Sequence, residues 1–106
     1  MPTLEDALGY LGIDYADDQV TRNVSRALDA ARRVVLGAVG DDLEDYLPDD
    51  PRAAELTLIY LDDLYSERGV SAKVSGATRR LVHDLEWQLK LELRRAREAA
   101  EEAGSV

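Results

Sequence analysis

The sequence predicts an all-α protein: a small bundle of about four helices that forms one domain over residues 1–106. Two observations carry this prediction. Apolar residues recur at steps of three and four in four separate segments, which is the period of a helix with one buried face. Alternation of apolar and polar residues, the pattern of a strand, never persists for more than a few positions. The predicted helices cover residues 4–11, 18–39, 51–67 and 77–103, with an acidic loop at 40–50.

The first two helices have clear start and stop signals. Thr3 is a good N-cap, with Asp6 at the capping-box position, and Gly12 ends the short first helix. Asp17 or Asp18 caps the second helix, which Gly40 ends. The second helix carries an apolar stripe of small and β-branched residues that suits close helix packing: Val20, Val24, Ala27, Leu28, Ala31, Val34, Val35 and Ala38.

The third helix is predicted to be the central one. Pro48 breaks any helix in the acidic loop before it, while Leu43, Tyr46 and Leu47 are expected to attach part of that loop to the body. Asp50 followed by Pro51 is a strong start signal for a helix. Apolar residues then cover most of the helix circumference, which is typical of a helix buried on several sides.

The fourth helix has a main apolar stripe and a second, smaller apolar feature. The stripe comprises Leu81, Val82, Leu85, Leu89, Leu93 and Ala96. Residues 94–106 have little to bury and are predicted to form a projecting helical tail. On the opposite side Trp87 and Leu91 are flanked by Arg80, Asp84 and Arg94. An exposed Trp beside Leu and Arg has the composition of an interface hot spot. The alternative is that Trp87 packs on the first helix or the acidic loop of its own chain.

Composition excludes several classes of protein. The net charge is −9 and there is no Cys, which excludes disulfides, thiol nucleophiles and thiolate metal sites. Residues 1–66 hold 15 acidic and 5 basic side chains, whereas residues 67–106 hold 7 and 8, so no overall basic footprint for DNA exists. The sequence shows no membrane span and no signal peptide, which predicts a soluble protein that is cytoplasmic or otherwise not secreted.

No catalytic constellation appears in the sequence. The sequence contains four pairs of adjacent Asp residues, at 17/18, 41/42, 49/50 and 62/63. Adjacent residues point to different faces of a helix, so these pairs do not form acid–base dyads. The window from Asp41 to Arg52 lacks the Gly and the closing Glu of a calcium loop. His83 has no partner that periodicity justifies, and GVSAKVSG is not a phosphate loop. We therefore expect no catalytic residue, metal or cofactor, and a protein that works by binding.

The chain resembles the head–tail connector, or DNA-packaging adaptor, family of tailed bacteriophages. The resemblance covers nearly the whole chain and rests on the order of four segments. These are YLGIDYADD at 10–18, VTRNVSRALDAARRVVLGAVG at 20–40, DPRAAELTLIYLDDLYSERG at 50–69 and VSAKVSGATRRLVHDLEWQLKLELRRAREAAEE at 70–102. It implies an all-helical virion protein of the neck, present in the host cytoplasm during assembly. Such subunits form a twelve-fold ring under the portal protein, extend the DNA channel and dock a stopper or tail-completion protein.

The resemblance suggests roles for the two surfaces. The face with Arg80, Asp84, Trp87, Leu91 and Arg94 is a candidate contact with the next subunit or the portal, and the tail is expected to order on meeting the portal. The acidic loop is a candidate channel- or tail-facing surface, because like charge disfavours sticking to DNA that passes without specific binding. Its acidic residues are Asp41, Asp42, Glu44, Asp45, Asp49 and Asp50. The free protein is expected to be able to remain monomeric.

Two other functions are compatible with the sequence. The first is a small acidic helical regulator, antitoxin-like or a transcription accessory domain, that binds a partner protein through the third and fourth helices. Arg79 and Arg80 follow a turn at 69–76, as in a helix-turn-helix, although the acidic body counts against DNA binding. The second is an enzyme with a carboxylate-held metal, for which the sequence offers no specific signal.

Overall fold

A computed structural model describes residues 1–66 and 76–104 and confirms the all-α prediction. The described elements are α1 (Leu4–Tyr10), α2 (Asp18–Val39), α3 (Leu43–Tyr46), α4 (Pro51–Ser66) and α5 (Gly76–Gly104). The bounds of α2 agree with the prediction at both ends, and those of α1 and α5 agree to within one residue. The predicted end of the third helix at residue 67 lies outside the described residues. So does the predicted turn at 69–76, except for Gly76, which is the first residue of α5.

Local side-chain contacts explain where the first helices begin. The Thr3 hydroxyl accepts a hydrogen bond from the Asp6 backbone N–H at 3.1 Å, and the Asp6 carboxylate accepts one from the Thr3 N–H at 3.0 Å. This is the predicted capping box. The Asp17 carboxylate accepts a bond from the Val20 N–H at 2.8 Å and so caps α2. Gly12, at φ 72°, makes the turn after α1.

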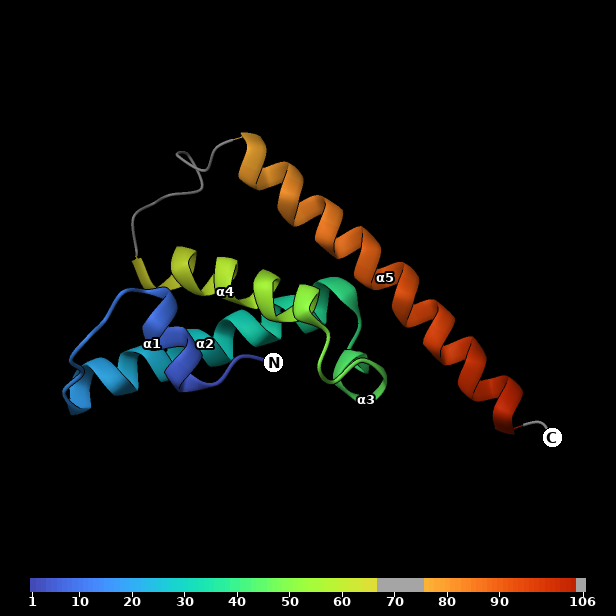
Figure 1. Ribbon diagram of the computed structural model, residues 1–106, viewed down its shortest axis with the longest axis horizontal. Helices are drawn as coiled ribbons and strands as arrows, with labels where there is room; N and C mark the ends of the chain where they lie inside the picture. Colours follow the sequence, from blue (N-terminus) through green and yellow to red (C-terminus); the bar gives the residue numbers. More distant parts are fainter. Residues whose placement is uncertain (67–75, 105–106) are drawn as a thin grey trace.

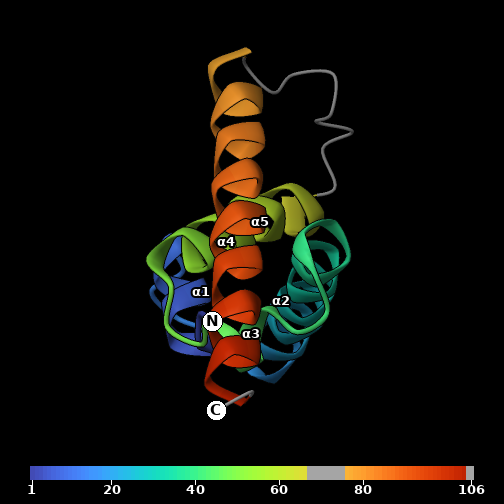
Figure 2. The same ribbon diagram turned by 90° about the vertical axis from the view of Figure 1, so that its right-hand side faces the viewer.

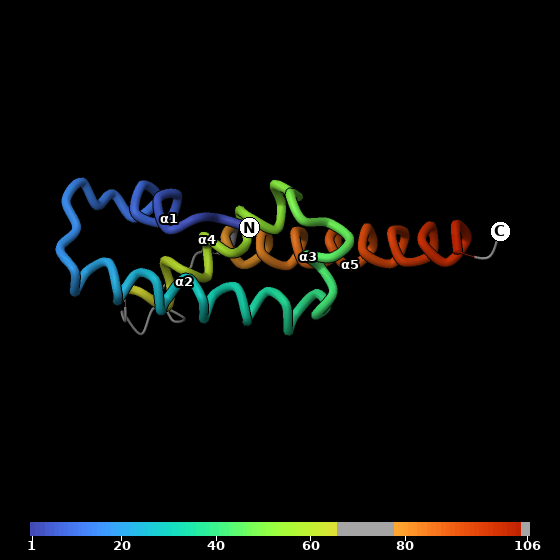
Figure 3. Tube along the Cα trace, turned by 90° about the horizontal axis from the view of Figure 1, so that it is seen from below, coloured from blue at the N-terminus to red at the C-terminus, as the bar shows by residue number. Residues whose placement is uncertain are grey.

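Helix α4 is central, as predicted. It contacts α1, α2 and α5, and α2 is the helix against which it packs most extensively. Figures 1 and 3 show α1 and α2 side by side below α4, with α5 crossing the other end of the molecule. Two buried clusters form the core, and α4 contributes to both: Ala53 and Leu56 to the one shared with α5, Leu61 to the one shared with α1.

The acidic loop contains a helical turn that the sequence analysis did not predict. Helix α3 spans Leu43–Tyr46, and the chain leaves it at Leu47, one residue before Pro48. Leu43 is fully buried in the cluster that joins α2, α4 and α5. Tyr46 remains 39% exposed, so Leu43 rather than Tyr46 attaches this turn to the body. The turn forms because burial of Leu43 compensates for a segment too short to be stable as a helix alone.

Helix α5 extends beyond the other helices at its N-terminal end (Figure 1) and past α3 at its C-terminal end (Figures 1 and 3). Leu85, Leu89 and Leu93 are buried, and Val82 and Ala96 are half-buried. Leu81, which periodicity assigned to the same stripe, is 45% exposed. The stripe prediction is therefore wrong at Leu81, because periodicity tells which way a side chain points and not whether another helix lies there.

Gly40 lies where the end of α2 meets α5. Its φ is 155°, and a Cβ built there would lie 2.7 Å from Leu93 Cδ2 and 2.9 Å from Arg97 Nη2. Gly40→Ala is therefore expected to lower the free energy of unfolding by about 2 kcal/mol, through strain and overpacking. Urea denaturation measures this change.

Gly37→Ala is the matched control for Gly40→Ala. Gly37 lies inside α2 with no atom within 4 Å of its built Cβ. Replacing a helical Gly by Ala in open space stabilises by up to about 1 kcal/mol. Equal effects of the two substitutions would contradict the close approach of α5 to Gly40.

Candidate functional site

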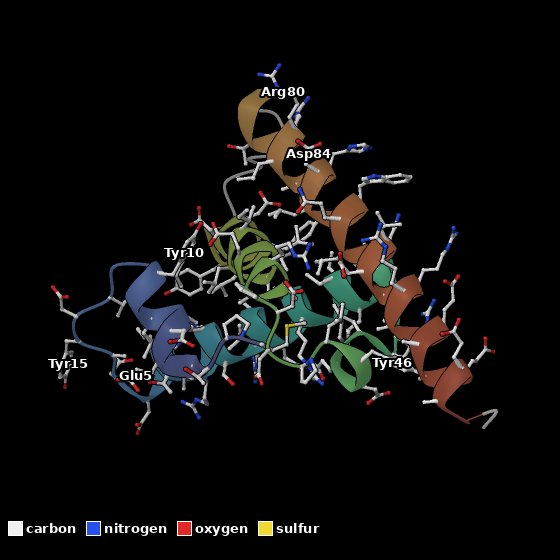
Figure 4. All side chains as sticks on the ribbon, turned by 45° about the vertical axis from the view of Figure 1, so that its right-hand side comes forward. Glu5, Tyr10, Tyr15, Tyr46, Arg80 and Asp84 are labelled. Carbon is white, nitrogen blue, oxygen red and sulfur yellow. The ribbon has the colours of Figure 1, made fainter. Side chains whose placement is uncertain are left out.

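The outer face of α5 carries the first candidate surface. Arg80, Asp84, Trp87, Leu91 and Arg94 are all exposed in the structure. They lie on the side of α5 opposite the buried Leu85, Leu89 and Leu93. Figure 4 shows Arg80 and Asp84 on the part of α5 that rises above the other helices. The structure therefore places the five predicted residues together on one face.

Trp87 is the most prominent residue of this face. It is 65% exposed, and Leu91, one turn further along, is 38% exposed. The alternative of Trp87 packed on α1 or on the acidic loop does not occur among the described residues. Monomeric proteins seldom leave a Trp side chain largely in water, so the face has the character of a surface that another molecule covers.

Contacts on the inner side hold α5 firmly in place. The Tyr60 hydroxyl of α4 donates a hydrogen bond to Glu86 Oε1 at 2.7 Å. Partial burial of the phenol, followed by the neighbouring Glu86 carboxylate, raises the pKa of Tyr60 to about 12. Arg97 forms a bidentate ion pair with Asp42 at the C-terminal side of the contact. The outer face is thus presented on a helix whose orientation is set by the core.

The second candidate surface is the acidic loop, in which three of the six acidic residues form ion pairs with arginines. Glu44 pairs with Arg32 of α2 through Nε at 2.5 Å and Nη2 at 2.6 Å. Asp42 accepts from Arg97 of α5, with the Nε contact at 2.7 Å. Each is a bidentate carboxylate–guanidinium pair, the geometry that favours such contacts. These two pairs tie the α3 segment to helices on both sides of it.

Asp50 forms the third pair and caps α4. Its carboxylate accepts a hydrogen bond from the Arg52 backbone N–H at 2.9 Å, and from the Arg52 guanidinium at 3.0 and 2.7 Å. Of the six acidic residues, Asp41, Asp45 and Asp49 are exposed and have no ion pair within residues 1–66 and 76–104. Within the acidic loop, the exposed carboxylates without an ion pair are therefore these three.

The arginine contacts lower the pKa of the paired carboxylates. The hydrogen bonds from Arg97, Arg32 and Arg52 are the main cause for Asp42, Glu44 and Asp50 respectively. The pKa of Asp6 is also lowered, first by its bond to the Thr3 backbone. In each case the charged form accepts hydrogen bonds that the protonated form loses.

Acid is therefore expected to destabilise the fold. A carboxyl whose folded pKa is depressed contributes stability that is fully present above its ordinary pKa, 3.8 for Asp and 4.5 for Glu. That contribution is lost as the pH falls through the lowered folded value. The urea midpoint should change little between pH 7 and pH 5.5 and fall steeply below about pH 4. A combined D42N, E44Q and D50N variant should show a flatter acid limb; an unchanged limb would contradict the pairing.

None of the three arginine partners was predicted from the sequence. Arg32 and Glu44 lie 12 positions apart, and Arg97 and Asp42 lie 55 apart, so no local pattern links them. The pair of Arg52 with Asp50 is the one that a local pattern could have predicted. Arg52 stands two residues after Asp50, at the second position of the helix that Asp50 caps. The first two pairs depend on how α2, α3 and α5 pack.

The described residues form a pocket but no metal-binding cluster. They contain no group of three or more His, Asp or Glu side chains that could hold a metal ion. A pocket of about 200 Å³ is lined by Met1, Pro2, Ser25, Leu28, Asp29, Arg32 and Thr57. Three of its polar side chains already have partners: Thr57 donates to the Ala53 carbonyl at 2.7 Å, Asp29 pairs with Arg33, and Arg32 pairs with Glu44.

Comparisons with known proteins do not assign a function. The chain matches no protein-family model, no curated protein and no solved structure. Within the described residues no helix combines the length and the apolar character that crossing a membrane needs.

Proposed function

We propose that this protein acts by binding other proteins through the outer face of α5. The observation that carries the proposal is the 65% exposure of Trp87. Trp and Arg are the side chains most often found at the centre of binding interfaces, and Leu91 beside Trp87 extends the apolar patch. The packing of α5 on the body through Leu85, Leu89 and Leu93 favours binding further, because a helix that is already packed has little order to gain on association.

The more specific proposal is a structural subunit of a bacteriophage neck, a head–tail connector. The resemblance in the order of sequence segments supports it, as does the all-helical fold. In a ring of identical subunits each contact is heterologous, so the outer face of α5 meets a different surface of its neighbour or of the portal. Asp41, Asp45 and Asp49 then give the channel or the tail side a negative surface that does not grip DNA.

Trp87→Ala tests this proposal. Hot-spot truncation typically costs 2 kcal/mol or more of binding energy, so co-sedimentation with portal-containing capsids should weaken at least about thirtyfold. Tyr15→Ala is the matched control, because Tyr15 is an aromatic residue that is 86% exposed at the opposite end of the molecule (Figure 4). Both variants should keep the thermal unfolding midpoint of the parent.

Two outcomes would contradict the proposal. If a folded Trp87→Ala protein co-sedimented as well as the parent, the outer face of α5 would not be the binding surface. Binding of the parent to duplex DNA, with an affinity that falls steeply as salt rises, would instead favour the acidic regulator. A connector whose channel surface is negative should show no such binding.

A further inference from the structure

The outer face of α5 continues one step beyond the five residues named above. Glu98 follows Arg94 by four positions and is exposed. The six residues are spaced by alternating steps of four and three, which is the seam of a coiled coil. The seam reads Arg80, Asp84, Trp87, Leu91, Arg94 and Glu98. Among the described residues Arg80, Arg94 and Glu98 have no ion pair, and Asp84 lies 4.0 Å from His83 Nδ1 with both side chains largely in solvent.

This seam is complementary to itself when it is reversed. A second α5 that runs antiparallel, with the symmetry axis on the outer face level with position 89 along the helix, places position 80 opposite 98, position 84 opposite 94 and position 87 opposite 91. The facing pairs are then Arg with Glu, Asp with Arg, and Trp with Leu. Because each pair occurs twice, the contact has six layers. The two central layers pair Trp with Leu, and on each side of them lie two layers that pair an acidic with a basic side chain.

We propose that the free protein forms a two-fold symmetric dimer in which two α5 helices pack antiparallel along this seam. A two-fold contact requires that residue i meet residue j while j meets i, and the reversed order satisfies this at every position. In a parallel pair Arg80, Asp84 and Arg94 would each face their own copy, and like charges in contact are unfavourable. Shifting the antiparallel pair by seven residues would put Trp87 opposite a carboxylate, so the register is also specified.

The fold leaves this side of α5 open. Figure 2 shows α5 in front of α4 and α3, with its outer side turned away from them. The buried residues Leu85, Leu89 and Leu93 lie on the opposite side, so the two bodies would lie outside the helix pair. From Arg80 to Glu98 the seam is about 27 Å long at 1.5 Å per residue. So short a contact, with only two apolar layers, is expected to be weak, so that monomer and dimer exchange as the protein is diluted.

The dimer goes beyond the proposed function and does not depend on it. It differs from a free monomer, which the family resemblance allows, and it occupies the face that binds a partner in the connector. The dimer would therefore have to separate before that face met a portal or another ring subunit. Its test uses the free protein alone, so it can fail while the portal-binding test of Trp87 succeeds, and the reverse also holds.

Sedimentation equilibrium of the full chain over a concentration series tests the dimer. The parent should pass from monomer to dimer, whereas Asp84→Arg and Arg94→Glu should each weaken the dimer at least tenfold, since like charges then face each other twice. An equimolar mixture of these two variants should form a heterodimer, because each altered side then meets an opposite charge. The double variant D84R and R94E should dimerise again. Circular dichroism verifies that each variant is folded.

Disulfide cross-linking then tests whether the two α5 helices run antiparallel. The chain has no Cys, so a single Cys substitution can form a disulfide only with the Cys of a second chain. A mixture of R80C and E98C proteins should form a mixed disulfide, and R80C alone should form little. A parent that remains monomeric near 1 mM (about −4 kcal/mol) overturns the proposal, as does a dimer that the two charge reversals leave unchanged or one in which R80C links to itself.

Discussion

Leu89→Ala is expected to lower the free energy of unfolding by about 3 kcal/mol, which is a large part of the stability of a domain this small. Leu89 is fully buried at the middle of the contact between α5 and the body. Its removal leaves a cavity that Leu85 and Leu93, held by the same rigid helix, cannot close. Urea denaturation followed by circular dichroism measures the loss.

Leu91→Ala is the matched control for Leu89→Ala. The substitution is the same and the helix is the same, but Leu91 lies on the outer face of α5. Its effect on unfolding should stay within about 0.5 kcal/mol. The same change should weaken the proposed α5 dimer, since Leu91 faces the partner's Trp there. Equal destabilisation by the two substitutions would contradict the assignment of inner and outer sides.

Leu43→Ala is expected to lower the free energy of unfolding by a similar amount, about 3 kcal/mol, and to act on the acidic segment first. Leu43 is the buried residue of α3, and it joins this single turn to α2, α4 and α5. An isolated helical turn is unstable in water, so its order depends on this contact. Hydrogen exchange should show α3 and the end of α2 opening before the rest of the protein.

Glu44→Gln separates the apolar contact from the ion pairs. It removes the charge that binds Arg32 while leaving Leu43 in place. Because both side chains are partly exposed to water, the expected cost is below about 1 kcal/mol. A Glu44→Gln cost equal to that of Leu43→Ala would mean that charge, and not burial, holds α3.

Much of the fold follows from short stretches of sequence. The Thr3 and Asp6 capping box, the Asp17 cap and the Asp50–Pro51 start signal each act within three residues, and each begins a helix where it was predicted. Helical periodicity likewise separated the two sides of α5 correctly at Leu89 and Trp87. These features were predictable because capping and periodicity are local properties of the chain.

The acidic segment shows where local reasoning stops. Its composition predicted a loop with six similar carboxylates, but the folded chain pairs Asp42, Glu44 and Asp50 with arginines and leaves the other three exposed. Leu43 lies in the same segment, and its burial turns part of the loop into α3. The partners of Glu44 and Asp42 come from α2 and α5, whose approach depends on the packing of the whole bundle.

By itself the sequence determined the helical class, the positions of the main helices and the two opposite faces of α5. The tertiary structure alone decided which of these faces is covered, and over what length. Leu81 points the same way as the buried leucines but extends past the body, whereas Leu43 is covered because α2, α4 and α5 converge on it. The physical reason is that helix formation and capping depend on neighbours along the chain, while burial and long-range ion pairs depend on neighbours in space.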